Sequence, residues 1–271
     1  MRAPPGARAG GGGCNRRPHP PHGRRSGARR RGPQAAARRT ERMFNVVTYN
    51  IHSAVGIDRR FDPDRVVRVL RRCEAPVIAL QEVGWHHRGE RHFDQFAFYA
   101  EELGMTCIEG PTKNHAHAHF GNAVLTAFPV RRRAIVDLTV PLELPRGAII
   151  AEILGPAGPF TLINMHLGLT AFHRRAQLRR LMPHLAGWKP PFVICGDYNS
   201  WKLTARTQRL LARLAPDATR LPSFRAPFAR IPIDRVQVSP EFRLLKAWRP
   251  EDRDCLLASD HLPVVATVAS S

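Results

Sequence analysis

The sequence predicts an α/β protein in which two stacked, mixed β-sheets are flanked by helices. Many strand patterns occur along the chain, with only three or four helix patterns between them. Their order fits neither the regular strand–helix alternation of a parallel fold nor an uninterrupted all-β meander, and no repeat of about 20–50 residues is apparent. Because every sheet and helix must bury an apolar face against another layer, this balance favours two sheets packed together with helices outside them.

The chain divides into a basic N-terminal segment and one body. Residues 1–42 are Gly, Pro, Ala and Arg with almost no large apolar side chain, and they hold twelve arginines against a single acid, Glu41. Such a segment cannot bury enough surface to offset its conformational entropy, so we predict that residues 1–42 are disordered. The body, residues 43–271, is long enough for one large domain and should carry the chemistry.

Positive charge is the strongest feature of the composition. The formal net charge is +20, of which residues 1–42 contribute +11 and the body contributes +9. This charge favours anionic partners such as nucleic acid, phospholipid surfaces or phosphorylated metabolites, but it does not choose among them. Arginines cluster at 131–133 and 174–180, where a solvated basic face is the simplest interpretation and a phosphate or lipid contact is the alternative.

The first elements follow from local patterns. A β-branched and aromatic strand ends at Asn50, and a helix begins at Asp62 and Pro63, with Asp as its cap. A short apolar strand at 77–80 then delivers Glu82 at its C-terminal end. Further strands are predicted at 105–108, 122–128, 134–139, 148–154, 160–166, 192–195, 233–238 and 264–268. Further helices are predicted at 93–103, 172–185 and 204–214.

Several predicted strands end in a polar residue of catalytic type. These residues are Asn50, Glu82, His166, Asp197 with Asn199, and Asp234. A single Asp or Asn at a strand end is usually a turn residue. Side chains on loops that a rigid sheet holds in place are, however, the usual way to build a site, so their recurrence favours a shared active site.

The segment Gly196-Asp197-Tyr198-Asn199 combines two complementary polar groups. Asp197 and Asn199 share one face of an extended segment, where Asp197 can accept a proton from water and Asn199 can donate to a phosphate oxygen. Gly196 permits close backbone approach or a positive φ. For these four residues alone, an ordinary turn is the alternative.

A second segment places a carboxylate beside an imidazole. Asp260 is a hard oxygen ligand suited to Mg²⁺ or Mn²⁺, and His261 can act as a general acid or base. His261 needs a carboxylate to orient it, and Asp234 is the predicted partner. Glu82 follows an apolar strand, where an acid is costly unless a cation compensates it, so we predict that it binds a metal.

Seven short motifs occur in the order of a known family. They are Thr48-Tyr49-Asn50-Ile51-His52, Leu80-Gln81-Glu82-Val83, Gly121-Asn122-Ala123-Val124-Leu125, Asn164-Met165-His166-Leu167-Gly168, Gly196-Asp197-Tyr198-Asn199, Ile233-Asp234-Arg235-Val236 and Ser259-Asp260-His261-Leu262-Pro263. Through them, roughly residues 44–269 strongly resemble the endonuclease/exonuclease/phosphatase superfamily. That group includes DNase I, exonuclease III-type AP endonucleases, neutral sphingomyelinases and inositol polyphosphate 5-phosphatases.

The resemblance implies a four-layer α/β sandwich with the site at one edge of the two sheets. It implies that Glu82 binds Mg²⁺ or Mn²⁺, with Asn50 and Asp260 close to the ion. It implies that Asp197 positions or deprotonates the attacking water, and that His261, supported by Asp234, stabilises or protonates the transition state. Phosphate oxygens would be held by Asn199 and His166, with Asn122 and Asn50 near them. Arg235 stands where the family often has His or Tyr and could add a phosphate contact.

Departures from the better-known subfamilies point to a small, bacterial-type member. The expected function is metal-dependent hydrolysis of phosphoester bonds in a phospholipid, a small phosphoester or a nucleic acid. A DNA or RNA endo- or exonuclease is the first alternative, and a catalytically inactive polyanion-binding protein of the same fold is the second. Five scattered cysteines, no apolar run of about 20 residues and no secretory signal lead us to expect a cytoplasmic monomer without a protein partner.

Histidines at three alternating positions, 115, 117 and 119, could share one face of a strand. A polar loop near the active site is the favoured interpretation, because no Cys or acid completes a zinc site. Trp85, His86 and His87 are interpreted as a surface loop that borders the cleft.

Overall fold

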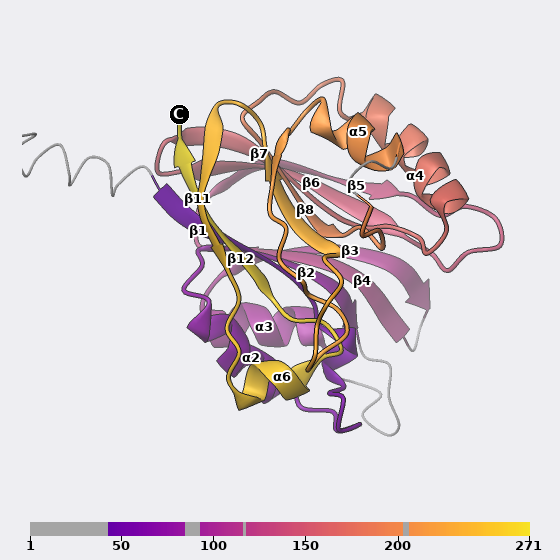
Figure 1. Ribbon diagram of the computed structural model, residues 1–271, viewed down its shortest axis with the longest axis vertical. Helices are drawn as coiled ribbons and strands as arrows, with labels where there is room; N and C mark the ends of the chain where they lie inside the picture. Colours follow the sequence, from indigo (N-terminus) through magenta and orange to yellow (C-terminus); the bar gives the residue numbers. More distant parts are fainter. Residues whose placement is uncertain (1–42, 85–92, 116–117, 203–205) are drawn as a thin grey trace, which may run out of the picture.

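The computed structural model describes residues 43–84, 93–115, 118–202 and 206–271, and the predicted disordered segment 1–42 lies outside them (Figure 1). Two six-stranded sheets face each other, and helices cover the outer face of each one. The fold class predicted from the sequence, a four-layer α/β sandwich, is confirmed.

The two sheets have related layouts. The first has the strand order β11-β12-β1-β2-β4-β3 and the second β5-β6-β7-β8-β10-β9. The first sheet contains β1 (Met43–Asn50), β2 (Val77–Gly84), β3 (Thr106–His115), β4 (Ala118–Thr126), β11 (Phe242–Trp248) and β12 (Val264–Ser270). The second contains β5 (Val130–Asp137), β6 (Gly147–Gly155), β7 (Gly158–His166), β8 (Phe192–Asp197), β9 (Asp217–Ala218) and β10 (Asp234–Val238). Each has a parallel pair near its centre, β1 with β2 and β7 with β8.

The helices divide between the two outer faces. The first sheet is covered by α2 (Pro63–Arg72), α3 (Gln95–Leu103) and α6 (Arg253–Ala258), and the second by α4 (Ala171–His184) and α5 (Arg206–Ala212). A short 3-10 turn, η1 (His52–Ala54), follows β1. None of the helices in the described ranges is long and apolar enough to cross a membrane.

Alternation of side chains along the strands explains the layers. On β1, Val47 and Tyr49 pack toward the helices, whereas Val46 lies in the core between the sheets. On β8, Val193 lies in that inner core and Ile194 packs toward α4 and α5. Because successive strand residues point to opposite faces, these apolar strands bury both faces of each sheet.

Local capping sets where the helices begin. Asp62 Oδ1 accepts a 2.8 Å hydrogen bond from Arg65 N at the start of α2, with Pro63 as first helical residue. Thr170 Oγ1 accepts from His173 N at 3.1 Å at the start of α4. The α2 start agrees with the sequence prediction, and α4 begins one residue before its predicted start.

Two elements near the C-terminus were not predicted. β11 is an edge strand whose burial does not alternate cleanly, so its sequence lacks a strand signature. α6 has only six residues, too few to show a helical period, although Asp252 caps it through the backbone N–H groups of Asp254 and Cys255. The strand predicted at 105–108 extends to His115.

Candidate active site

Strand register brings three of the predicted residues side by side. His166 ends β7 directly beside Asp197 at the end of β8, and Asp197 in turn pairs with Asp234 at the start of β10. Side chains alternate between the two faces of a strand, and Asp197 and Asp234 are on the same face as the residues that form the core between the sheets. They therefore point toward the first sheet. All three are almost fully buried.

The first sheet supplies Asn50 and Glu82 from its own parallel pair. Asn50 ends β1, and its Nδ2 donates to Glu82 Oε1 at 3.1 Å and to Asp197 Oδ2 at 3.2 Å. By simple alternation Glu82 would face the helices. A register shift between Leu80 and Val83, together with a φ of 56° at Glu82, turns its carboxylate toward Asn50 instead. A positive φ in a non-glycine residue costs energy, and such strain is concentrated at functional sites.

Asp197 lies at the centre of the group. Its Oδ2 accepts from Asn50 and lies 3.4 Å from His166 Nε2 and 3.8 Å from His261 Nε2, while Oδ1 accepts from Asn199 N at 2.8 Å. Burial first, and then the charge of Asp234, raises the pKa of Asp197 to about 7, against the opposing effect of His261 and the hydrogen-bond donors. The carboxyl group is therefore poised to exchange a proton near neutral pH.

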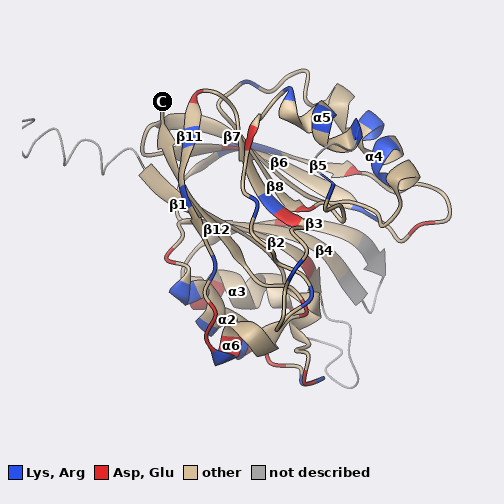
Figure 2. Cartoon of the chain, viewed as in Figure 1, with Lys and Arg blue, Asp and Glu red and all other residues tan. Residues whose placement is uncertain are grey.

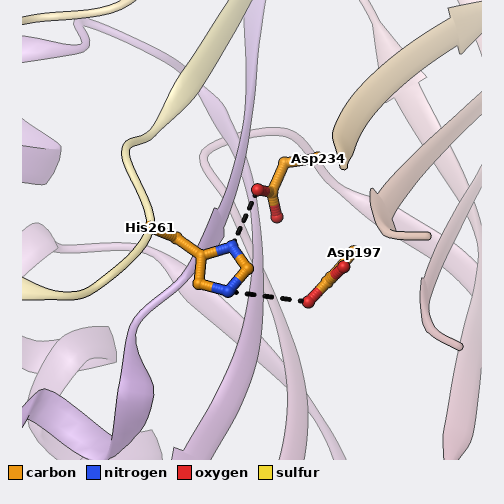
Figure 3. Close-up of side chains that lie close together, drawn as sticks. All are labelled: Asp197, Asp234 and His261. Carbon is orange, nitrogen blue, oxygen red and sulfur yellow. Dashed lines mark hydrogen bonds and ion pairs between the residues drawn. The ribbon is translucent and has the colours of Figure 1, made fainter. Parts of the chain in front are cut away.

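His261 lies between two carboxylates (Figure 3). Its Nδ1 donates to Asp234 Oδ2 at 2.8 Å, and its Nε2 points toward Asp197. Burial lowers the pKa of His261, but the charge and hydrogen bond of Asp234, with Asp197 and Asp260, outweigh it and raise the pKa to about 10. His261 therefore favours the protonated form at neutral pH, and the carboxylate in contact with its Nδ1 is that of Asp234, the residue named from the sequence as its partner.

His166 is held in the opposite protonation state. Its Nδ1 lies 3.0 Å from Nη1 of the buried Arg146. A guanidinium can only donate, so Nδ1 accepts and the ring hydrogen is on Nε2, which faces Asp197 and Glu82 at 3.4 and 3.9 Å. Burial, followed by the charges of Arg146 and His261, lowers the pKa of His166 well below its ordinary value. His166 is thus a neutral hydrogen-bond donor.

The turn after β8 fixes Asn199. Its Nδ2 donates to Leu167 O at 2.8 Å. It also lies 3.2 Å from His166 Nε2, but both nitrogens carry hydrogen in this tautomer, so they do not bond to each other. Arg174 Nη1 holds the backbone from outside by donating to Asn199 O at 2.8 Å. Gly196 has a φ of 139°, and a Cβ there would lie 1.8 Å from Met165 O, so only glycine fits at this position.

A buried polar network joins the two sheets beneath the site. Gln81 Nε2 donates to Thr48 Oγ1 at 3.1 Å within the first sheet and to Asn164 Oδ1 at 2.8 Å in the second. Asn164 Nδ2 donates back to Leu80 O and Ala123 O, both at 2.9 Å. Because these groups are fully buried, breaking one bond leaves an unsatisfied partner, so the network fixes how the two halves of the site face each other.

Comparison with known proteins identifies the family. Residues 47–261 match the Endonuclease/Exonuclease/phosphatase family. The chain belongs to this family. The resemblance inferred from the seven motifs is therefore confirmed.

Relatives agree over most of the chain. The uncharacterized protein YbhP of Escherichia coli K12 is 28% identical over 253 residues, covering 83% of this chain and 96% of YbhP. An endonuclease/exonuclease/phosphatase structure from Beutenbergia cavernae matches with a TM-score of 0.66 and 24% identity, over 85% of this chain and 72% of that one. The mannosyl-6-phosphatase Bt3783 of Bacteroides thetaiotaomicron matches with a TM-score of 0.62 and 17% identity, over 83% and 99%. The two structures show the shared fold.

The three predicted metal ligands, Asn50, Glu82 and Asp260, belong to the same end of the first sheet. Ser259 Oγ donates to Asn50 O at 2.8 Å, which places Asp260 beside the end of β1. Asn50 Oδ1 accepts from His52 N at 3.1 Å, so the amide presents nitrogen, not oxygen, to the site. The ligand candidates that this arrangement leaves are Glu82 and Asp260, whose carboxylates are 22% and 28% exposed.

A different trio also has metal-like geometry. One oxygen or nitrogen atom from each of Asp197, Asp234 and His261 lies within 4.8 Å of the others. His261 Nδ1 is, however, already bonded to Asp234 Oδ2, and both carboxylates of the trio are almost fully buried. Glu82 and Asp260 are more exposed than the trio and are hard oxygen donors of the kind that Mg²⁺ prefers, so they form a second candidate site for a cation.

Two predicted substrate contacts bond to backbone carbonyl groups in this structure. Asn122 is buried, and its Nδ2 donates to Gly147 O at 2.8 Å, where it supports the start of β6. Arg235 is fully buried on the other face of β10, with Nη2 bound to Ser200 O at 2.6 Å. Arg235 therefore holds the turn after Asn199. Because its side chain is fully buried, it is not accessible to a phosphate group of a substrate. The side chains of His115, His117 and His119, and residues 85–87, lie outside the described part of the chain.

Arg146, which fixes the tautomer of His166, was not identified from the sequence. It lies at the end of an irregular loop before β6, where no periodic pattern marks it. Its one signal in the sequence was a basic residue directly before a strand. That strand pairs with the strand that ends at His166, because Ala148 is the partner of Met165.

Proposed function

We propose that this protein is a hydrolase that cleaves phosphoester bonds with the help of Mg²⁺ or Mn²⁺, through direct attack of water on phosphorus. The observation that carries the proposal is the setting of Asp197. Its carboxylate, with a pKa near 7, is surrounded by a neutral donor histidine, a protonated histidine and an amide. These are the groups that an in-line displacement at phosphorus needs around the attacking water.

Asp197 acts as the base. A general base works best when its pKa lies near the working pH, and burial has moved Asp197 into that range. Asn50 and Asn199 N hold the carboxylate in place, so a water bound at Oδ2 is oriented as well as deprotonated.

His166 and Asn199 bind the phosphoryl oxygens. His166 presents Nε2–H without adding a titrating charge, because Arg146 holds its Nδ1. Asn199 has a second amide hydrogen beyond the one that Leu167 O accepts. Donors fixed before the reaction stabilise charge that develops on these oxygens in the transition state.

His261 acts as the acid. It is protonated at neutral pH, and Asp234 holds Nδ1 so that Nε2–H points into the site. From there it can stabilise the transition state or donate its proton to the leaving oxygen.

Glu82 and Asp260 would hold the divalent cation. A bound cation supplies Lewis-acid polarisation of a phosphoryl oxygen. The strained backbone of Glu82 supports this assignment, because the φ of 56° is what brings its carboxylate into the site. A further support for the reaction class is that one protein of the same fold, Bt3783, is a mannosyl-6-phosphatase.

Hydrolysis of bis(p-nitrophenyl) phosphate and p-nitrophenyl phosphate by the purified full chain tests the proposal. We expect turnover with Mg²⁺ or Mn²⁺, none with EDTA, and a loss of about 10²–10⁴-fold in Asp197→Asn. The control is Asp64→Asn, an exposed acid on α2 far from the site. A chain that binds phosphate but turns over neither these esters nor nucleic acid or phospholipid would instead be the inactive polyanion-binding protein.

A further inference from the structure

The most exposed large apolar side chains gather on the loops around the active site. Six such residues form what we call the apolar rim: Leu142, Leu144, Leu169, Phe172, Trp201 and Phe228. Their exposure runs from 59% to 100%, whereas no other large apolar residue in the described part of the chain exceeds 46%. Single exposed apolar residues are normal, but the six most exposed ones in four neighbouring loops are not.

Each rim loop in the second sheet is connected to His166, either directly or through Arg146. The loop with Leu142 and Leu144 ends at Arg146, which binds His166. Leu169 lies in the β7–α4 connection that follows His166, and Phe172 lies in the first turn of α4. Arg174 donates to both Leu169 O and Asn199 O.

The other two rim residues lie on segments that are connected to Asn199, His261 and Asp260. Trp201 lies two residues after Asn199. Phe228 belongs to a loop in which the ring of Phe224 lies 4.8 Å from that of His261 and Ala226 N donates to Asp260 O at 2.8 Å. Each rim residue therefore lies on, or next to, a segment that also contacts a group of the active site.

Unpaired positive charge accompanies the rim. Exposed basic residues on or beside these loops are Arg175, Lys202, Arg206, Arg225 and Arg230, and none forms an ion pair with a described acid. The one acid in the described parts of these loops, Glu143, is bound to His173. Figure 2 shows that Lys and Arg continue onto α4 and α5, where five arginines line a hollow of about 650 Å³.

We propose that the face carrying the active site docks on an anionic phospholipid bilayer, with the apolar rim entering the boundary between headgroups and acyl chains. Apolar side chains ringed by Lys and Arg are the pattern of proteins that lie on such a surface. Three of the six rim residues are leucines, which cannot stack on bases, so a bilayer fits the rim better than a single-stranded nucleic acid.

The docking has a consequence for the substrate. It brings lipid headgroup phosphates to Asp197 and His166, so the substrate class is a phospholipid phosphoester. This consequence rests on the proposed hydrolase function, whereas the docking itself does not.

Vesicle sedimentation in EDTA measures docking without catalysis. The full chain is mixed with vesicles of phosphatidylcholine containing about a quarter phosphatidylglycerol. The rim variant is Leu142→Ser with Phe228→Ser, and the matched control is Ile135→Ser with Leu245→Ser, which lie on the edge strands β5 and β11. We expect the rim variant to bind at least about tenfold more weakly and the control to bind as the unmodified chain does. All three share the basic N-terminal segment, so the difference reports the rim.

Trp201 gives an independent readout. Lipids brominated on their acyl chains should quench its fluorescence, and Trp201→Phe should remove the quenched component. Equal vesicle binding by the rim variant and the unmodified chain would overturn the docking. It would also be overturned if the rim substitutions weakened only the binding of single-stranded DNA, or only a dimer seen by sedimentation velocity. Docking that persists in a chain inactive on every ester would leave the surface assigned and refute the hydrolase function alone.

Discussion

Two buried groups at the site are tuned to opposite protonation states near neutral pH. Asp197 has a pKa of about 7 and His261 one of about 10, so the base is largely unprotonated and the acid is protonated between these values. Asp234 contributes to both shifts, because its charge raises the pKa of its two neighbours. One fully buried carboxylate therefore shifts both limits of the working range of the acid–base pair in the same direction.

The pH profile of kcat/KM should be bell-shaped. Activity should rise as Asp197 loses its proton near pH 7 and fall as His261 loses its proton near pH 10. A cation bound near Asn50 would lower the pKa of Asp197, so the acid limb should lie at or below pH 7. In Asp234→Asn both pKa values should drop, and both limbs should move to lower pH. A profile in which only one limb moved would show that Asp234 does not couple the two groups, and Asp64→Asn should leave both limbs in place.

Arg146 is a positioning residue whose effect passes through His166. In Arg146→Met, Nδ1 of His166 loses its donor, so the ring can change tautomer and its pKa should rise. We expect kcat to fall about 10–100-fold, with partial rescue in Arg146→Lys, which keeps a cationic donor. The ¹⁵N chemical shifts of His166 report the tautomer directly. An unchanged tautomer beside reduced activity would mean that Arg146 only supports the fold.

At the scale of elements, the strand ends were predictable and the irregularities were not. Asn50, His166 and Asp197 end strands whose apolar patterns are clear in the sequence, so the active-site edge could be inferred. The position of Glu82 depends on a register shift against β4, a partner about 40 residues away, and local pattern carries no record of it. The direction in which Arg235 points could not be predicted either, because only the pairing of β10 decides which face its side chain occupies.

Substitution of Gly196 tests how closely β8 packs against β7 beside Asp197. A methyl group at this position would collide with Met165 O on the neighbouring strand, and the φ of 139° is unfavourable for any other residue. We expect Gly196→Ala to lower the free energy of unfolding by at least about 2 kcal/mol, measured by urea denaturation. Gly187→Ala is the control, because a Cβ there meets nothing within 4 Å and its φ is ordinary. Equal stability of the two variants would show that β7 and β8 can separate without cost.

For the whole molecule, the site is divided between the sheets. The first sheet and its loops supply Asn50, Glu82, Asp260 and His261, and the second supplies His166, Asp197, Asn199 and Asp234. Links that cross between them include Asn50 to Asp197, His261 to Asp234, and Gln81 to Asn164. The proposed cation ligands therefore belong to one half and the base to the other, and the stacking of the sheets sets the distance between them.

Cation binding should be measurable as a gain in the stability of the folded chain, without any turnover. A ligand that binds only the folded chain stabilises it by mass action, by about 2.7 kcal/mol at a hundredfold excess over its Kd. Mg²⁺ should therefore raise Tm by several degrees in a chain of this size. Glu82→Gln and Asp260→Asn should each reduce the shift, while Glu102→Gln, an exposed acid paired with Arg71, should keep it. If Asp234→Asn abolished the shift and Glu82→Gln did not, the cation would belong to the trio around His261. The assignment of those three residues to proton transfer would then be wrong.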